Sequence, residues 1–169
     1  PYAFREIDAL QRDDRAAFDR ALFGHIGHVI RNGVRSVLLS LSRGRLARSP
    51  VSGPAAPYWR RLQWASATFA TFADLAMGSL GGDLKRKEKI TGRFADVLGW
   101  MLLICAALRR FEADGRRAED RPLLHWACEH GFFRIQTALQ GLAQNLRVPG
   151  VGWFLRGPVA LWGRVNPIG

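Results

Sequence analysis

The stretch ITGRFADVLGWMLLICAAL, residues 90–108, decides the fold class of this chain. Its large apolar residues recur at steps of three and four, which places on one helical face Ile90, Phe94, Val97, Met101, Cys105 and Leu108. Leu98 and Leu102 widen this face. The longest uncharged apolar run, 97–108, falls well short of the ~20 residues that a bilayer requires. The pattern therefore predicts a bundle helix over about 83–113 and no membrane-spanning segment.

The same periodicity predicts three more long helices, at about 13–42, 54–80 and 120–146. Glycine- and proline-marked breaks separate them. In the first helix one helical face carries Phe18, Leu22, Ile26, Val29, Gly33, Val37 and Leu41. In the fourth helix the residues expected to face inward are Leu123, Trp126, Ala127, Phe133, Leu139 and Leu142. Because the connections are short, the fold expected over 1–150 is an all-α, antiparallel four-helix bundle. A short C-terminal helical appendage, 151–169, follows it.

The appendage mixes aromatic and basic residues, an amphipathic composition that suits a membrane surface. The candidate membrane-contact residues are Trp153, Phe154, Arg156, Trp162 and Arg164. Gly157-Pro158 interrupts any continuous amphipathic helix there. The alternative is that the aromatic rings dock on the bundle or on a domain absent from this chain.

The chain is strongly basic, with 25 Lys and Arg against 14 Asp and Glu and a formal net charge of +11. This excess favours an anionic partner, such as a lipid surface, a phosphorylated ligand, nucleic acid or an acidic domain of the same polypeptide. Nucleic acid is disfavoured, because the arginines are spread over every predicted helix and loop rather than gathered on one face. A basic helical module that binds an anionic membrane or nucleic acid remains the alternative function.

No catalytic or metal-binding motif stands out in the sequence. Four histidines and two cysteines form neither a Cys-x-x-Cys pair nor a His-Glu-x-x-His motif, and no Gly-x-Ser-x-Gly elbow is present. Cys105 and Cys128 lie in apolar helical context, which indicates a reducing cytoplasm, with the inner face of the cell membrane as a second location. The chain opens at Pro1 and reads as a segment of a longer polypeptide, whose catalytic residues are expected upstream.

One basic cluster conflicts with helix electrostatics. Lys85, Arg86, Lys87 and Lys89 fall in the first two turns of the predicted helix 83–113, with Asp83 as its cap. Cations near a helix N-terminus are each unfavourable by about 0.3–1 kcal/mol, so these four make a candidate anion or interface site. The alternative is that acidic residues of a neighbouring helix or domain neutralise the cluster. Farther along, Arg93 and Asp96 are three apart and predict a structural ion pair.

Three segments resemble the C-terminal domain of the large bacterial fatty acyl-CoA dehydrogenases. They are DRALFGHIG (residues 19–27, with Asn32 and VRS at 34–36 after it), GGDLKRKEKITGRFADVL (residues 81–98) and DGRRAEDRPLLHW (residues 114–126). The segments occur in the family's order and cover nearly the whole chain.

The resemblance implies a parent flavoenzyme that dehydrogenates fatty acyl-CoA between its α and β carbons in β-oxidation. In that family a glutamate removes the α-proton and FAD accepts the β-hydride. These parts lie in upstream domains that are absent from this chain, so no catalytic, cofactor-binding or metal-binding residue is assigned here. The domain is expected to be non-catalytic and to bind no FAD. It is expected to support packing against the upstream domains, a homodimer, or membrane attachment.

Overall fold

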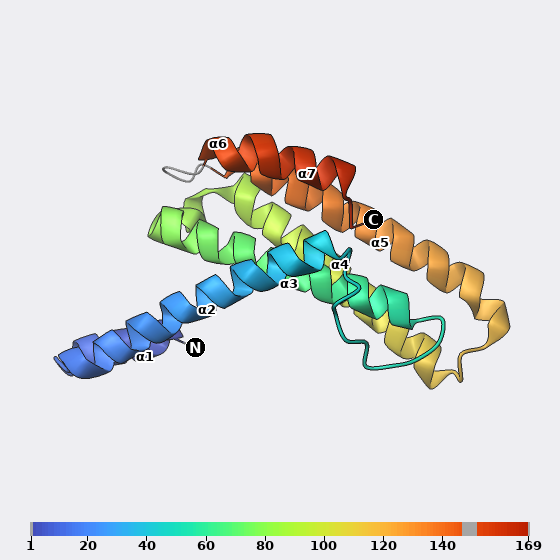
Figure 1. Cartoon of the computed structure of the whole chain (residues 1–169), viewed down its shortest axis with the longest axis horizontal. Coiled ribbons are helices and arrows are strands. Elements are labelled where there is room, and N and C mark those ends of the chain that lie inside the picture. Colours follow the sequence, from blue (N-terminus) through green and yellow to red (C-terminus); the bar gives the residue numbers. More distant parts are fainter. Residues whose placement is uncertain (1, 147–151, 169) are drawn as a thin grey trace.

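The computed structural model describes residues 2–146 and 152–168, and all their regular structure is helical. Five helices carry most of the chain (Figure 1): α1 (Tyr2–Gln11), α2 (Arg15–Leu41), α3 (Ala56–Leu80), α4 (Glu88–Ala113) and α5 (Arg121–Asn145). Shorter turns are the 3₁₀ helices η1 (Gly81–Arg86) and η2 (Ala118–Asp120), α6 (Gly152–Phe154), the π-helical η3 (Leu155–Val159), and α7 (Ala160–Val165). The all-α prediction is confirmed.

Local chemistry explains where the long helices begin and end. The carboxylate of Asp14 accepts a hydrogen bond from the backbone N–H of Ala17 at 2.9 Å, which caps α2. Gly44 and Gly81 have φ values of 74° and 50°, a left-handed conformation that lets the chain turn after α2 and α3. These signals place α2, α3 and α5 within two residues of their predicted bounds.

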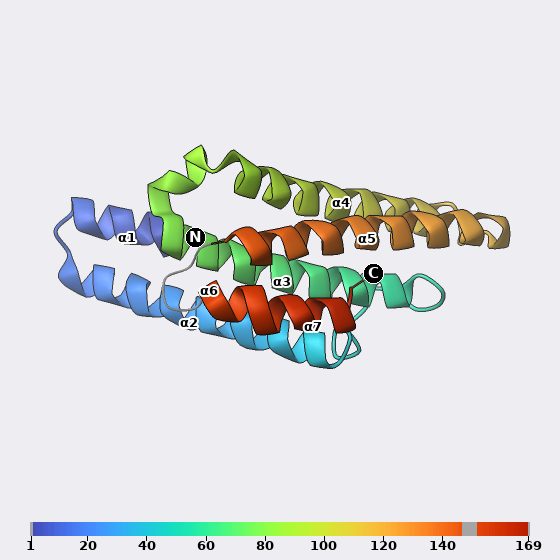
Figure 2. The ribbon, with the colours of Figure 1, turned by 90° about the horizontal axis from the view of Figure 1, so that it is seen from above.

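Three helices hold most of the core. Figure 2 shows that consecutive long helices run antiparallel, with α3, α4 and α5 side by side. The largest fully buried side chains come from α4, α5 and the residue just after α5, and are Phe132, Ile104, Leu108, Ile135, Leu142, Leu146, Val97 and Cys128. The α4–α5 contact is close because Gly131 has no side chain: a Cβ there would lie 2.7 Å from Cγ1 of Ile104.

The antiparallel four-helix bundle is not confirmed in detail. Helix α2 lies along α3, but it contributes only Leu39 to the described core. Together with α1, the N-terminal part of α2 projects beyond the end of the other helices (Figure 1). The core is instead completed by the C-terminal segment, which buries Leu155, Ala160 and Ile168.

The C-terminal segment 152–168 runs alongside α5 (Figure 2). The side chain of Gln136 donates to the carbonyl of Gly163 at 2.7 Å and accepts from the backbone N–H of Ile168 at 3.1 Å. The guanidinium of Arg61 donates to the carbonyl of Ile168 at 2.7 Å. These bonds fix residues 163–168 to α3 and α5. The predicted boundary between bundle and appendage, near residue 150, lies outside the described residues.

One helix among the described residues, α4, is long and apolar enough to cross a membrane by length and composition. The expectation that no segment would meet these criteria is therefore wrong. One such helix is weak evidence for a membrane span, because the core helix of a bundle meets the same criteria. In this fold one face of α4 packs on α3 and α5, and the other exposes Leu98, Leu102 and Leu103.

Candidate functional site

Helix α2 meets α3 through polar side chains. The amide of Asn32 donates to the carboxylate of Asp74 at 3.2 Å, and its backbone carbonyl accepts from the hydroxyl of Thr71 at 3.4 Å. One turn farther on, the hydroxyl of Ser36 donates to that of Thr68 at 3.4 Å. Asn32 and Ser36 therefore face α3 together with the buried Leu39, while the arginines of this helix, such as Arg31 and Arg35, are exposed.

As a consequence, the apolar face of α2 points away from the core. Seven large apolar residues on it are between 45% and 69% exposed, and we call them the outer apolar face: Phe23, Ile26, Ile30, Val34, Val37, Leu38 and Leu41. Ile26, Val37 and Leu41 belong to the predicted apolar face of this helix, and all three are exposed. In α5, Leu123, Trp126 and Phe133 were predicted to face inward but are 60–67% exposed, so that prediction is wrong for these three residues. In α2 the predicted apolar residues recur at the correct helical period. The residues that contact α3, however, lie on a neighbouring part of the helix surface that includes polar side chains.

Arginines border one edge of the outer apolar face. A groove of about 590 Å³ separates Ile30, Val34 and Leu38 from the loop that follows α2. Its lining includes the guanidinium-bearing residues Arg31, Arg35 and Arg48. An apolar floor with a cationic border suits a partner that is apolar at its centre and anionic at its edge.

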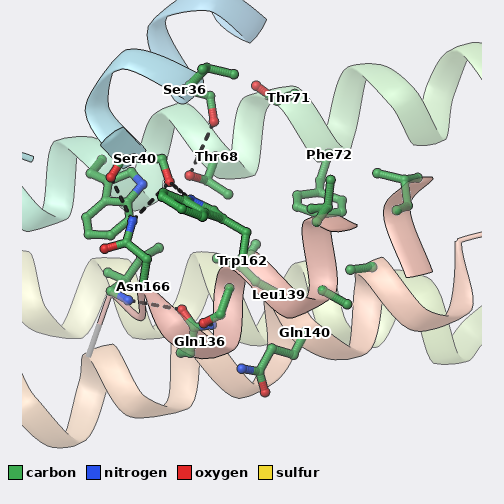
Figure 3. Close-up of a pocket in the computed structure, with 18 of the residues that line it drawn as sticks. Ser36, Ser40, Thr68, Thr71, Phe72, Gln136, Leu139, Gln140, Trp162 and Asn166 are labelled. Carbon is green, nitrogen blue, oxygen red and sulfur yellow. Dashed lines mark hydrogen bonds between the residues drawn. The ribbon is translucent and has the colours of Figure 1, made fainter. Parts of the chain in front are cut away.

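A larger pocket of about 660 Å³ lies at the other edge of α2. Four parts of the chain form it, namely the C-terminal half of α2, the middle of α3, the end of α5 and the C-terminal segment. In Figure 3, Phe72 and Leu139 border the space, while Ser40 faces Trp162 and Asn166 on one side of it. The described lining contains no ionisable side chain at all.

This lining does not fit FAD, because it offers no cation to the pyrophosphate of a dinucleotide. We therefore assign no FAD-binding residue in the described lining of this pocket. A metal site is equally unsupported: among residues 2–146 and 152–168, no three His, Cys, Asp or Glu side chains gather as metal ligands would.

The basic cluster lies elsewhere on the helices than predicted. Lys85 and Arg86 end the 3₁₀ helix η1, and Lys87 is the N-cap residue of α4, so only Lys89 lies in the first turn of α4. Cations are favourable at the C-terminal end of a helix, and Glu88 supplies an acidic residue to the first turn of α4. The premise of an electrostatic conflict, with Asp83 as the cap, is wrong, and the role of an anion site stays a prediction.

The structure does not pair the two residues predicted to form an ion pair. The described ion pairs do not include one between Arg93 and Asp96, and Asp96 is exposed. The guanidinium of Arg93 crosses Gly141 of α5 instead, so closely that a Cβ at Gly141 would lie 2.0 Å from Nη1. Arg93 therefore has a packing position between α4 and α5.

The candidate membrane-contact residues divide into two groups. Trp153, Arg156 and Arg164 are exposed, and Arg156 donates to the backbone carbonyl of Gly152 at 3.1 Å. Trp162 is also exposed, but it is bound to the fold, because its indole N–H donates to the hydroxyl of Ser40 at 2.8 Å. The side chain of Phe154 lies outside the described structure. Membrane contact by this segment stays a prediction.

A cluster of titratable residues that the sequence did not indicate joins α3 to α5. Arg61 forms a two-pronged ion pair with Glu129, with N–O distances of 2.5 and 3.1 Å, and its guanidinium lies 4.3 Å from the ring centre of Phe132. The hydroxyl of Tyr58 lies 2.6 Å from Nδ1 of His125. These residues lie on two separately predicted helices and are far apart in the sequence. No local motif could therefore have revealed the cluster.

Two pKa shifts show what this cluster does chemically. The pKa of the Cys128 thiol is raised to about 12, and burial is the main cause. The nearby Glu129 carboxylate also raises this pKa, by more than the Arg61 guanidinium lowers it. Burial is also the main cause that raises the pKa of the Tyr58 hydroxyl. Cys128 and Glu129 raise this pKa to a smaller extent. A protonated, enclosed thiol is a poor nucleophile, so we interpret the cluster as a structural link that also holds Ile168.

The comparisons with known proteins agree with the fold and with the resemblance noted in the sequence. No solved structure matches the chain. A model of one family, described as acyl-CoA dehydrogenase, C-terminal, bacterial type, matches residues 1–168. Since the match covers nearly the whole chain, this protein belongs to the bacterial-type acyl-CoA dehydrogenase C-terminal domain family.

Proposed function

We propose that this chain is the non-catalytic docking domain of an FAD-dependent fatty acyl-CoA dehydrogenase, and that it holds the upstream dehydrogenase domains through the outer apolar face. The observation that supports this is the orientation of α2. A helix of 27 residues buries only two of them, Ala21 and Leu39, and turns seven large apolar side chains to the outside.

The size of the outer apolar face favours a permanent partner. Burying a large apolar side chain contributes about 1.5–3 kcal/mol, so several such residues together outweigh the estimated 4–15 kcal/mol lost on association. Contiguous exposed apolar surface of this kind commonly marks an interaction site on a soluble protein. Because the chain carries a net charge of +11, the partner surface is expected to be acidic around an apolar centre.

The parent enzyme supplies the chemistry in this proposal. Its base would remove the α-proton of a fatty acyl-CoA, and FAD bound by the upstream domains would supply the acceptor for the β-hydride, as in β-oxidation. The present chain contributes position: it orders the domains that carry these groups and stabilises the homodimer that they form. The enzyme is proposed to act in the cytoplasm.

The proposal is tested by separating the chain from its upstream part. The two are expressed as separate polypeptides and their association is measured by isothermal titration calorimetry. The triple variant Ile26→Ser/Ile30→Ser/Val34→Ser should weaken association by about a hundredfold or more, because three large apolar contacts are lost.

The matched control is Leu98→Ser/Leu102→Ser/Leu103→Ser on the outer side of α4, where three leucines are similarly exposed. The control should associate as the natural chain does. Equal association of the α2 variant would refute the proposal. Equal loss in both variants would show that α2 has no special part in docking. Self-association of the chain that depends on the α2 residues would make a second copy the partner.

A second candidate function is attachment to an anionic membrane surface, and the arginine-lined groove beside α2 favours it. An amphipathic helix with cations beside its apolar face is typical of proteins that lie on membranes. Binding to phosphatidylglycerol vesicles that is lost in the α2 triple variant would support this function. Loss in Trp153→Ser/Arg156→Gln/Arg164→Gln alone would assign it to the C-terminal segment instead.

A further inference from the structure

The pocket of about 660 Å³ between α2, α3, α5 and the C-terminal segment is partly open to solvent and is large and apolar enough to take an apolar ligand. Protein interiors pack at the density of organic crystals, and the few voids in them rarely exceed a water molecule. Apolar cavities also do not hold ordered water, because water needs polar partners. The volume falls within the range of about 300–1,000 Å³ that is usual for small-molecule sites.

Several polar groups of the lining already have partners within the fold. The indole N–H of Trp162 and the amide of Asn166 both bind Ser40, with distances of 2.8 Å to its hydroxyl and 2.7 Å to its carbonyl (Figure 3). Gln136 uses both ends of its amide on the C-terminal segment. An occupant with many polar groups, such as an extended peptide, would leave its own N–H and C=O groups without partners here.

The charges beside the pocket indicate what the head group of the occupant should be. Arg156 and Arg164 are exposed and follow the lining residues Leu155 and Gly163 directly in the sequence. Residues 152–168 contain no Asp or Glu. An alkyl chain in the pocket would therefore place its terminal group near cations, which favours an anionic head.

We infer that this pocket binds a long-chain fatty acid, with the alkyl chain between α2 and the C-terminal segment and the carboxylate near Arg156 and Arg164. The pocket overlaps the outer apolar face of α2 only in part. Val37 and Leu41 belong to both surfaces, but Ile26, Ile30 and Val34 do not line the pocket.

Gly33 allows the pocket to be filled without disturbing the fold. It lies on α2 and lines the pocket, and a Cβ at this position meets nothing within 4 Å. Gly33→Leu therefore adds volume to the pocket and replaces a poor helix former by a good one. Gly99→Leu is the matched control, because Gly99 is also helical and open but lies on the outer side of α4.

The test is a fluorescence titration of the full-length protein with cis-parinaric acid, a fluorescent fatty acid, without vesicles. The natural protein should show a saturable site that Gly33→Leu weakens by about tenfold or more and Gly99→Leu leaves intact. Arg164→Gln should weaken the acid by about two- to fivefold and leave its methyl ester unaffected. Association with the upstream domains should stay unchanged in Gly33→Leu, so this result is independent of the docking proposal.

Equal binding by the natural protein and Gly33→Leu would overturn the inference, as would absence of a saturable site. Equal weakening of acid and ester by Arg164→Gln would overturn the placement of the carboxylate. Binding only to phosphatidylglycerol vesicles, with no affinity for the free acid, would replace the pocket by a membrane surface.

Discussion

Helices α2 and α5 are nearly equal in length but opposite in what they bury. Helix α5 has 25 residues and buries eleven of them, whereas α2 has 27 and buries two. Both have apolar residues at helical spacing. In α5 that face meets α4 and α3, and in α2 the polar residues Asn32 and Ser36 take the contact with α3. The comparison shows that an amphipathic period defines an apolar face without defining which element, or which other domain, covers it.

The largest expected effect is the difference between two phenylalanines. Phe132→Ala removes a fully buried ring from α5 and should lower the free energy of unfolding by about 3–5 kcal/mol, because it leaves a cavity. Phe23→Ala removes an exposed ring from α2 and should change it by about 0.5 kcal/mol or less in the 169-residue chain. Urea unfolding followed by circular dichroism measures both. Equal losses would show that α2 is packed as tightly as α5.

Two glycine-to-alanine substitutions, each of which adds one methyl group, test how closely α4 and α5 pack. Gly131→Ala should destabilise the chain by about 1–3 kcal/mol, since the new Cβ would lie 2.7 Å from Cγ1 of Ile104. Gly99→Ala, with nothing within 4 Å of its Cβ, should stabilise it by up to about 1 kcal/mol. Thermal unfolding of the two variants gives opposite shifts of Tm if the α4–α5 contact is as close as described. A shift in the same direction would contradict it.

A smaller effect is expected from pH, through Cys128 of α5. Its thiol pKa is raised in the folded state from 9.0 to about 12, so above pH 9 the unfolded chain loses this proton first. Stability is therefore fully present below pH 9 and decreases toward pH 12, by about 1 kcal/mol between pH 9 and pH 10 from this group. Cys128→Ser lacks the thiol and should show a shallower decrease in urea unfolding over that range. Identical slopes would mean that burial does not hold the thiol protonated.

Much of the fold follows from the sequence because its signals are local. Gly44, Gly81 and the prolines near the start of α3 mark helix ends, and the resemblance to the family rests on the segments 19–27, 81–98 and 114–126. Helix α1 was not predicted, although Phe4, Ile7 and Leu10 recur in it at helical spacing. The sequence predicts the start of α4 at about residue 83 rather than at Glu88. The reason is that Gly81–Arg86 forms a 3₁₀ helix, which the sequence pattern does not distinguish from an α-helical turn.

The candidate sites depend on contacts that are distant in the sequence. The large pocket exists because Ser40 meets Trp162 and Asn166, which are 122 and 126 residues away. The orientation of α2 depends on Asn32 reaching Asp74, 42 residues farther along. Periodicity reports only on the helix in which it occurs, so neither the outer apolar face nor the pocket could be derived from it.

The central claim is that the outer apolar face is covered in the intact enzyme, and hydroxyl-radical footprinting tests it most directly. Oxidation of Phe23, Ile30 and Leu41 is measured by mass spectrometry in the 169-residue chain and in the full-length protein, with a reporter peptide to equalise the radical dose. All three are exposed in the chain and should oxidise readily there. In the full-length protein we expect much less oxidation of these three residues, because the upstream domains bury them. Equal oxidation in the chain and in the full-length protein would contradict it.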